Sequence, residues 1–207
     1  MSTVYLSTAY LAPVQYYCKL ISFDIVLVEA NENYLKQTCR NRCVIATANG
    51  IQSLTVPIEN PSTDKCPIKD IRISDHGKWR HLHWQALVSA YGMSPYFEYY
   101  MDDFAPFYEC TYHFLFDLNE QLRLVVCKLL DIQPVVNFTT EYHPSPLYDF
   151  REIIRPKHPV RDKTFEPQPY YQVFREKHGF LKNLSIVDLL FNMGPEAVLV
   201  LQRSIKS

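Results

Sequence analysis

The chain has 207 residues and a mass of 24.3 kDa, and 47% of its residues are hydrophobic, so it can bury a core without disulfides or metals as supports. Its 21 Lys and Arg nearly balance its 22 Asp and Glu, which excludes a strongly basic nucleic-acid-binding protein and gives no reason to expect an anionic membrane as main partner. Any anion-binding site must therefore be local.

No hydrophobic run approaches the roughly 18 residues that cross a bilayer, and the N-terminus lacks the basic start and apolar centre of a signal peptide. We therefore expect a cytoplasmic protein without a transmembrane segment. Six cysteines without a C-x-x-C pair indicate reduced, structural thiols rather than a disulfide framework or a zinc ribbon. Neither a G-x-G-x-x-G motif nor a P-loop occurs, and we expect no cofactor.

Residues 1–75 are predicted to be rich in sheet. They begin with a strand over residues 3–11, a helix that starts at Pro13 and a buried strand over residues 24–30. This order predicts a βαβ unit, whose two strands run parallel. Ligands of open α/β sheets bind outside the carboxyl ends of the strands, so a pocket is expected near the turn at Pro13.

The Asn49-Gly50 pair lies between two apolar runs, which is the strongest short-range signal for a hairpin. A further strand is predicted over residues 68–74. Because parallel and antiparallel pairs are both expected, the fold class predicted is α/β, with a mixed, partly parallel sheet in the N-terminal third and a helical middle and C-terminal region.

Residues 77–132 have the apolar spacing of helices. The first helix covers residues 77–92, Ser94 and Pro95 are placed to begin a second, and a longer one covers residues 112–132.

Residues 134–169 contain 7 of the 14 prolines, together with a loose run of positive charges through Arg151, Arg155 and Arg161. Such a stretch resists regular structure, and it is either a lid or a strap. The C-terminal helices are predicted over residues 185–205. Ser185 and Asp188 resemble a capping box at their start, and Gly194 with Pro195 separates the two helices. We expect a single domain over residues 1–207.

Two cysteines, Cys39 and Cys43, lie in a polar segment before the hairpin. On a helix they would share a face and bind a soft metal, but no nearby residue supplies a third and fourth ligand, so no metal site is expected. A nucleophilic thiol requires a neighbouring cation, which Arg40 or Arg42 would provide. Buried, unreactive cysteines are the commoner interpretation.

If residues 38–45 are extended, Arg40 and Arg42 lie on one face and form a clamp for phosphate or carboxylate. The alternative is a strand edge that charge protects from mispairing.

His83 lies in the apolar stripe of its helix beside Trp79, as either a hydrogen-bonded core residue or an acid-base group. Asp117 either orients a histidine or caps a helical turn. The turn at Asn192 and Gly194 suits an anion, and it is equally typical of a helix-helix corner.

Four blocks of the sequence resemble the WbqC-like protein family over nearly the whole chain. They are YLAPVQYYCKLISFDIVLVEANENYLKQTCRNRCVIATANGIQSLTVPI, KWRHLHWQALVSAYGMSPYFEYY, FLFDLN and YYQVFREKHGFLKNLSIVDLLFNMGPEA. Members of this bacterial family occur in gene clusters for surface polysaccharide (O-antigen), and transfer of glycine to a sugar has been suggested as a role. The resemblance implies an enzyme that transfers an aminoacyl or acyl group to a nucleotide-linked or lipid-linked sugar.

The alternative is a non-catalytic module that binds a glycan precursor or a protein partner. The enzyme hypothesis assigns catalysis to His83 and Asp117, and it requires His83, Arg40 and Arg42 to line one cavity. The residues expected to bind the ligand, a small molecule or nucleotide sugar, are Tyr10, Tyr16, Gln37, Arg40, Asn41, Arg42, Trp79, Asn192 and Gly194. A nucleotidyltransferase-like relative is a third, weaker interpretation, because the expected nucleotide loop is missing.

Overall fold

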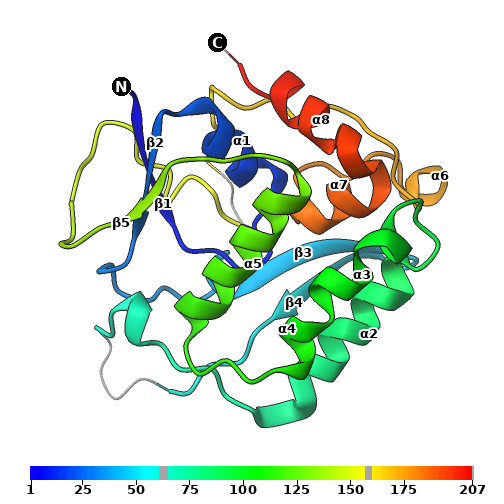
Figure 1. The fold of residues 1–207 in the computed structure, drawn as a ribbon, viewed down its shortest axis with the longest axis horizontal. Helices are drawn as coiled ribbons and strands as arrows, with labels where there is room; N and C mark the ends of the chain where they lie inside the picture. Colours follow the sequence, from blue (N-terminus) through cyan, green and yellow to red (C-terminus); the bar gives the residue numbers. More distant parts are fainter. Residues whose placement is uncertain (61–64, 157–159, 207) are drawn as a thin grey trace.

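The computed structural model describes residues 1–60, 65–156 and 160–206. A parallel sheet stands at one side of the molecule, in the order β1-β2-β5 (Figure 1). Its strands are β1 (Thr3–Ser7), β2 (Ile25–Glu29) and β5 (Val136–Phe138). β1 and β2 pair in parallel along their whole length, so the predicted βαβ unit is confirmed.

Helix α1 (Val14–Ser22) connects β1 to β2. It is buried from Val14 to Leu20, because the sheet lies on one side of it and helices α7 and α8 pack on the other. A helix enclosed in this way must carry apolar residues nearly all round, as Tyr17 and Leu20 illustrate. Two of its buried residues, Gln15 and Lys19, are polar, and their partners come from distant parts of the chain.

The antiparallel pair forms a second sheet, which consists of β3 (Arg42–Thr47) and β4 (Gly50–Thr55). The parallel and antiparallel pairs that the sequence predicts are therefore both present, but they belong to two separate sheets of an α/β fold.

The hairpin turn lies one residue earlier than the Asn49-Gly50 pair suggests. Thr47 pairs with Gly50, so the two-residue loop is Ala48 and Asn49, and Gly50 is the first residue of β4. Gly50 has a φ of 103°, which a residue without a Cβ adopts at no steric cost.

The strand predicted over residues 68–74 is wrong. Residues Ile68–Asp70 form a short 3-10 turn (η1), and the residues after it make isolated bridges instead of a ladder. The backbone of this segment is used elsewhere: the carbonyl of Ile71 accepts a hydrogen bond from the amide of Leu115, at the start of a helix.

The predicted helical middle is confirmed. It consists of η2 (His76–Lys78), α2 (Trp79–Tyr91), α3 (Phe97–Phe104), α4 (Pro106–Glu109) and α5 (Leu115–Leu129). α3 begins at Phe97 rather than at Pro95. The hydroxyl and the amide of Ser94 both donate to the carbonyl of Tyr91, so Ser94 closes α2 and does not cap α3.

The C-terminal helices are also confirmed. They follow the short α6 (Arg175–His178) and comprise α7 (Ile186–Met193), η3 (Gly194–Glu196) and α8 (Ala197–Arg203).

The predicted capping box at the start of α7 is absent from the described contacts. Ser185 precedes the helix, but its hydroxyl donates to the carbonyl of Leu11 at 2.7 Å. The carboxylate of Asp188 instead accepts hydrogen bonds from Tyr91, Tyr170 and Gln172. Both side chains therefore join distant segments instead of capping one helix.

The described residues of the Pro-rich region, 134–156 and 160–169, largely lack regular structure, as expected, but they include β5, which pairs in parallel with β2. Residues 148–150 run beside the other edge of the sheet. There the amide of Tyr5 donates to Tyr148 and the amide of Phe150 donates to Tyr5. The region thus supplies both outer borders of the parallel sheet.

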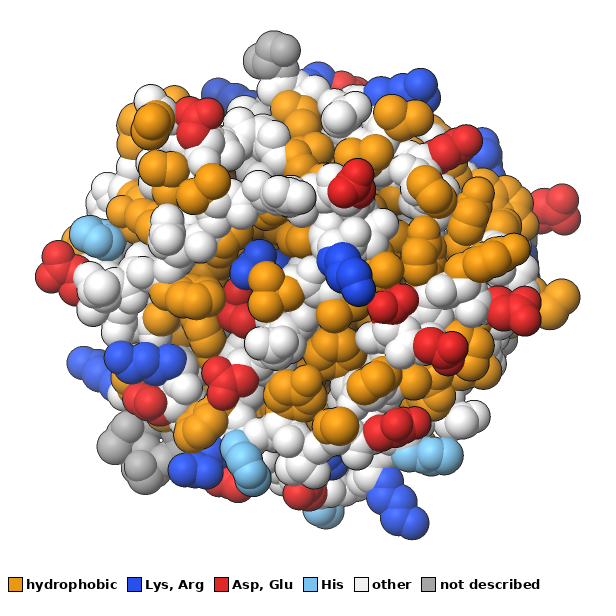
Figure 2. Space-filling view, viewed as in Figure 1, with side chains coloured by type: hydrophobic (Ala, Val, Ile, Leu, Met, Phe, Trp, Pro, Cys, Tyr) orange, Lys and Arg blue, Asp and Glu red, His pale blue; other side chains and the backbone are white. Residues whose placement is uncertain are grey.

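On the face shown in Figure 2, positive and negative side chains are interspersed with hydrophobic ones, as the balanced composition predicts. Among the helices of the described residues, none is long and apolar enough to cross a membrane.

Gly194, which the sequence offered as an anion site, has a packing role. Its φ is 53°, and a Cβ added there would lie 2.5 Å from the ring of Tyr96. We predict that Gly194→Ala lowers the free energy of unfolding by about 1–3 kcal/mol, because the added methyl group would overlap the ring of Tyr96 and because alanine is strained at this positive φ. Urea denaturation measures the change. Tyr96→Ala should recover part of the loss; if it recovers none, the ring contact is not the cause.

Candidate functional site

A cavity with a volume of about 590 Å³ lies among the described residues. Four segments surround it: the outer face of the β3–β4 hairpin, the turn before α1, residues of the Pro-rich region between 155 and 167, and residues 182–185. Pro13 lies on its wall, but the tyrosines near this turn do not, and the cavity lies against the hairpin rather than at the carboxyl ends of the parallel strands. The volume falls within the about 300–1,000 Å³ that is typical of small-molecule sites.

The hairpin provides one wall through strand alternation. Arg42 and Val44 of β3 face the cavity, and Ser53, the partner of Val44, faces it from β4. The alternate residues Cys43, Ile45 and Leu54 are buried, although Cys43 still contributes to the lining. Nε of Arg42 donates to Oγ1 of Thr55 across the hairpin at 2.9 Å, and this bond orients the guanidinium.

The opposite wall is held by a buried ion pair. Nζ of Lys19 lies 2.6 Å from a carboxylate oxygen of Asp162, and the two side chains are only 1% and 4% exposed. Lys19 also donates to Thr164 at 2.6 Å, and Nε2 of Gln15 donates to Asp162 at 2.9 Å. Burial opposes ionisation of Asp162, but the hydrogen bonds from Lys19, Gln15 and Thr164 outweigh it and lower the pKa of this carboxyl.

The cavity is positively charged. Its described lining contains four cationic residues, Arg42, Arg155, Arg161 and Lys182, and a single acidic residue, Asp162. Because Asp162 is paired with Lys19, it does not neutralise the others. The arrangement favours an anionic ligand.

Backbone strain also collects at this cavity. Leu11 and Asn183 line it with φ values of 40° and 55°, which non-glycine residues rarely adopt. Such conformations cluster at functional sites. The side chain of Asn183 exchanges hydrogen bonds with Gln15, and its Oδ1 accepts from the Gln15 amide. This amide of α1 is therefore not available to a ligand.

Cys39 and Cys43 line the cavity as protonated thiols. Burial raises the pKa of Cys39 to about 12, and the nearby Arg40 and Arg42 only partly offset it. Burial raises the pKa of Cys43 as well. Neither thiol has the lowered pKa that a nucleophile requires.

Arg40 does not join Arg42 in a clamp. Residue 40 precedes β3, so the predicted alternation begins only at Arg42. The Arg40 side chain is buried: Nε donates to Glu32 at 2.9 Å, and Nη2 contacts Glu32 at 2.5 Å and Ser7 at 2.8 Å. Its guanidinium therefore stabilises the fold through these contacts.

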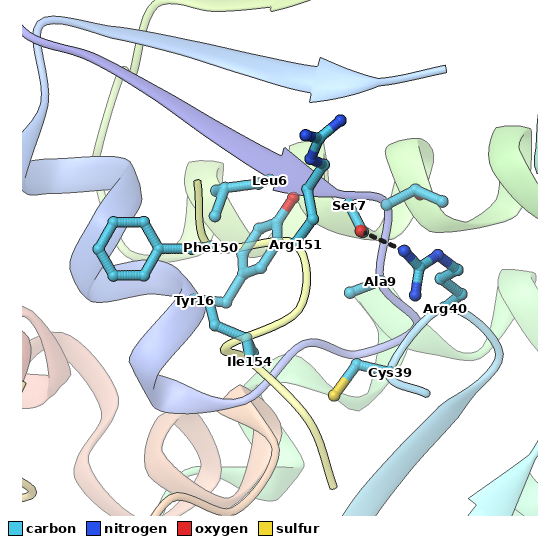
Figure 3. A pocket seen from close by; sticks show the side chains of 10 residues that line it. Leu6, Ser7, Ala9, Tyr16, Cys39, Arg40, Phe150, Arg151 and Ile154 are labelled. Atoms are coloured by element: carbon cyan, nitrogen blue, oxygen red, sulfur yellow. Dashed lines mark hydrogen bonds between the residues drawn. The ribbon is translucent and has the colours of Figure 1, made fainter. Parts of the chain in front are cut away.

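A second, much smaller cavity lies at the carboxyl end of β1, between Arg40, Tyr16 and the 150–154 segment (Figure 3). Arg40 extends toward Ser7, and the guanidinium of Arg151 points away from the cavity. The cavity measures about 10 Å³, which suits one water molecule and excludes a sugar. The carboxyl edge of the sheet is therefore filled by ion pairs, such as Arg151 with the fully buried Glu29 at 3.1 Å.

His83 belongs to a buried polar chain and is outside the described lining of both cavities. Its Nδ1 lies 3.0 Å from the hydroxyl of Tyr10, which lies 2.9 Å from the hydroxyl of Tyr108. Trp79 packs edge-on against the His83 ring. Burial lowers the pKa of His83 to about 4, so the ring is neutral at pH 7. The condition that His83, Arg40 and Arg42 line one cavity is not met among the described residues.

The remaining predicted residues are dispersed. Asp117 is exposed in the first turn of α5, and Gln37 is exposed in a turn with a φ of 62°. Nδ2 of Asn41 donates to the carbonyl of Val56, and Nδ2 of Asn192 donates to that of Asp188. Of the candidate ligand-binding residues, the structure places Arg42 alone in the described lining of the large cavity.

Sequence reasoning missed Arg155, Arg161 and Lys182 as site residues. The first two were visible as part of a positive run in the Pro-rich region, but the run is equally typical of a solvated loop. Lys182 had no local signal. No three His, Cys, Asp or Glu within residues 1–60, 65–156 and 160–206 are grouped as a metal ion would require.

The sequence profile of the WbqC-like protein family matches residues 8–154, which is most of the chain. The chain belongs to this family. It is also similar to the uncharacterized protein Rv1507c of Mycobacterium tuberculosis, with 28% identity over 211 residues that cover 89% of this chain and 91% of the relative. No solved structure matches it.

The first prediction from the site concerns His83. Because its pKa is about 4 in the folded chain and about 6.5 when unfolded, the unfolded state binds more protons between these values. The contribution of neutral His83 to the free energy of unfolding should be fully present above pH 6.5. The free energy of unfolding should fall by about 3 kcal/mol as the pH drops to 4. His83→Gln should flatten this part of the pH profile of unfolding. An unchanged slope would show that other groups cause it.

The second prediction separates Arg40 from Arg42. Arg40→Ala leaves Glu32 buried without its cation and should lower the free energy of unfolding by about 3–5 kcal/mol. Arg42→Ala removes a half-exposed side chain and should cost less than about 1 kcal/mol. Denaturant titration of both variants measures the contrast. Equal losses would contradict the assignment of Arg40 to the fold and of Arg42 to the cavity.

Proposed function

We propose that this protein binds a phosphate-linked sugar in the 590 Å³ cavity and acts in the biosynthesis of a bacterial surface polysaccharide. The observation that carries the proposal is the cavity itself. Its described lining holds four cationic side chains, of which Arg155 is paired with Glu152, and one acidic residue, Asp162, which is paired with Lys19. Membership of the WbqC-like family supports the choice of pathway.

The lining suits a ligand with one charged and one uncharged part. Guanidinium groups bind phosphate in bidentate geometry, and Arg42 and Arg161 offer two of them. The cavity also has apolar and aromatic surface from Leu11, Ile51 and Phe165. Such surface packs against the less polar faces of a sugar or a base.

As a transferase, the protein would pass an aminoacyl group, such as glycine, or an acyl group to the bound sugar. The sugar amine or hydroxyl would form a bond to the acyl carbon, the bond from that carbon to the leaving group of the donor would break, and the proton of the nucleophile would pass through solvent to the departing group. A covalent thiol intermediate is not part of the proposal, because Cys39 and Cys43 have raised pKa values. The cavity would act by positioning and by charge.

The second candidate is a binding module without catalysis. It is favoured by the place of His83, which lies in the core with Tyr10 instead of on the cavity wall. Asp162, the acidic residue of the described lining, is occupied by Lys19 and Gln15. A cavity that binds an anion, and whose described lining offers neither a histidine nor an unpaired carboxylate, would hold a precursor for another enzyme.

A thermal-shift screen tests the proposal, since a ligand that binds the native state raises the Tm. Nucleotide sugars should raise the Tm, with neutral sugars as the control. At about 100 times the Kd the gain is about 2.7 kcal/mol of stability. Binders are then incubated with glycyl and acyl donors and the products are analysed by mass spectrometry. Product formation supports the transferase, and binding without product supports the module. No shift with any sugar phosphate contradicts both.

A further inference from the structure

We propose that Arg42, Arg161 and Lys182 form a binding site for a diphosphate group, and that Asp162 is the positioning residue that holds Arg161 over it. The inference rests on the proposed function and specifies the chemistry of its ligand: the diphosphate of a nucleotide-linked or lipid-linked sugar. It replaces the Arg40–Arg42 clamp, because the cations that accompany Arg42 come from remote segments.

Arg42 is oriented but not neutralised. The hydrogen bond from Nε to Thr55 fixes the plane of the guanidinium on the outer face of the hairpin. Among the contacts within the described residues, none joins Nη1 or Nη2 of Arg42 to an acceptor. Two donors in a fixed plane are what a phosphate oxygen pair binds.

Lys182 reaches the same cavity from the segment before α7. The amide of Ser185 donates to the carbonyl of Val44 at 2.8 Å, which places this segment along β3. Asn183 is held by Gln15 on its other side. Lys182 is exposed and lines the cavity, so its ammonium is available to a bound anion.

Arg161 is placed by its neighbour. The carboxylate of Asp162 is fixed by Lys19 and by Gln15, both on the buried helix α1. The ammonium of Lys19 lies 4.5 Å from the ring centroid of Phe150, which adds a cation–π contact to the anchor. Because Asp162 cannot move without breaking a buried ion pair, the adjacent Arg161 stays at the cavity wall.

Arg155, the fourth cation, is left out of the site. Its guanidinium is paired with Glu152, three residues earlier, so its charge is already balanced. Arg42, Arg161 and Lys182 come from three segments and have no ion pair with the described part of the chain, and three such cations match a diphosphate better than a single carboxylate, which one guanidinium would satisfy.

The test measures the Kd of inorganic pyrophosphate by calorimetry at low and at physiological salt. Arg42→Ala, Arg161→Ala and Lys182→Ala should each weaken binding about tenfold, as expected for the loss of one charged hydrogen bond. Lys163→Ala, which removes an exposed cation outside the described lining, is the matched control and should change Kd less than twofold. Unchanged affinity in the three variants, or no binding of pyrophosphate at all, overturns the site.

Asp162→Asn gives a sharper result, because charge and position predict opposite signs. Removing a negative charge beside an anion site should tighten binding if charge alone matters. If Asp162 positions Arg161, binding should weaken, and the double variant with Arg161→Ala should bind no more weakly than Arg161→Ala alone. Tighter binding by Asp162→Asn, in protein shown by circular dichroism to be folded, overturns the positioning role.

Two further ligands distinguish a nucleotide-linked from a lipid-linked diphosphate, and they distinguish failure of the diphosphate site from failure of the proposed function. A nucleotide sugar, UDP-N-acetylglucosamine, and a lipid diphosphate, farnesyl diphosphate, are compared with pyrophosphate. The ligand that binds more tightly than pyrophosphate, and whose binding depends on Arg161, identifies whether the diphosphate belongs to a nucleotide or to a lipid. If pyrophosphate binding depends on the three cations but neither larger ligand binds better, the diphosphate site stands and the proposed function fails. If a nucleotide sugar binds equally well to all variants, the site fails and the function stands.

Discussion

Helix α1 is enclosed between the parallel sheet and the C-terminal helices, and it carries Gln15 and Lys19 into the interior. A buried ammonium costs several kcal/mol unless a carboxylate and further acceptors surround it. Asp162 forms an ion pair with Lys19, and Thr164, 145 residues away, accepts a hydrogen bond from it. Asn183 donates a hydrogen bond to Gln15. Three of these residues, Gln15, Asp162 and Asn183, also line the large cavity, so the partners that the buried side chains of one helix require help to determine where the pocket is.

A comparable constraint shapes the carboxyl edge of the sheet. Arg40 with Glu32, and Arg151 with Glu29, are buried where open α/β folds usually bind their ligands. These pairs leave room for about one water, and the ligand-sized space is displaced to the outer face of the hairpin. Two neighbouring arginines therefore differ in their surroundings: Arg40 is buried in an ion pair with Glu32, and Arg42 lines the large cavity.

Local patterns predicted the fold well where they are strong. Strand, helix and strand around Pro13 gave the parallel unit, the Asn49-Gly50 pair gave the hairpin to within one residue, and helical spacing gave the middle and the C-terminus. Prediction of secondary structure failed where hydrogen-bond partners far away in the sequence determine the conformation of a segment. Residues 68–74 bond to the start of α5 instead of to a strand, and β5 is strand only because β2 lies beside it.

The sequence by itself determined the α/β class and the family, and strand alternation placed Arg42 on the face of β3 that lines the cavity. Tertiary structure alone decided which charged side chains are paired. The sequence around Arg40 does not show that the carboxylate of Glu32, eight residues away, accepts a hydrogen bond from its guanidinium. Tertiary structure also decided that His83 lies in the core with Tyr10, and that Arg161 and Lys182 meet Arg42 at one cavity. The physical reason is that pairing and desolvation depend on distance in space, which no local pattern in the chain encodes.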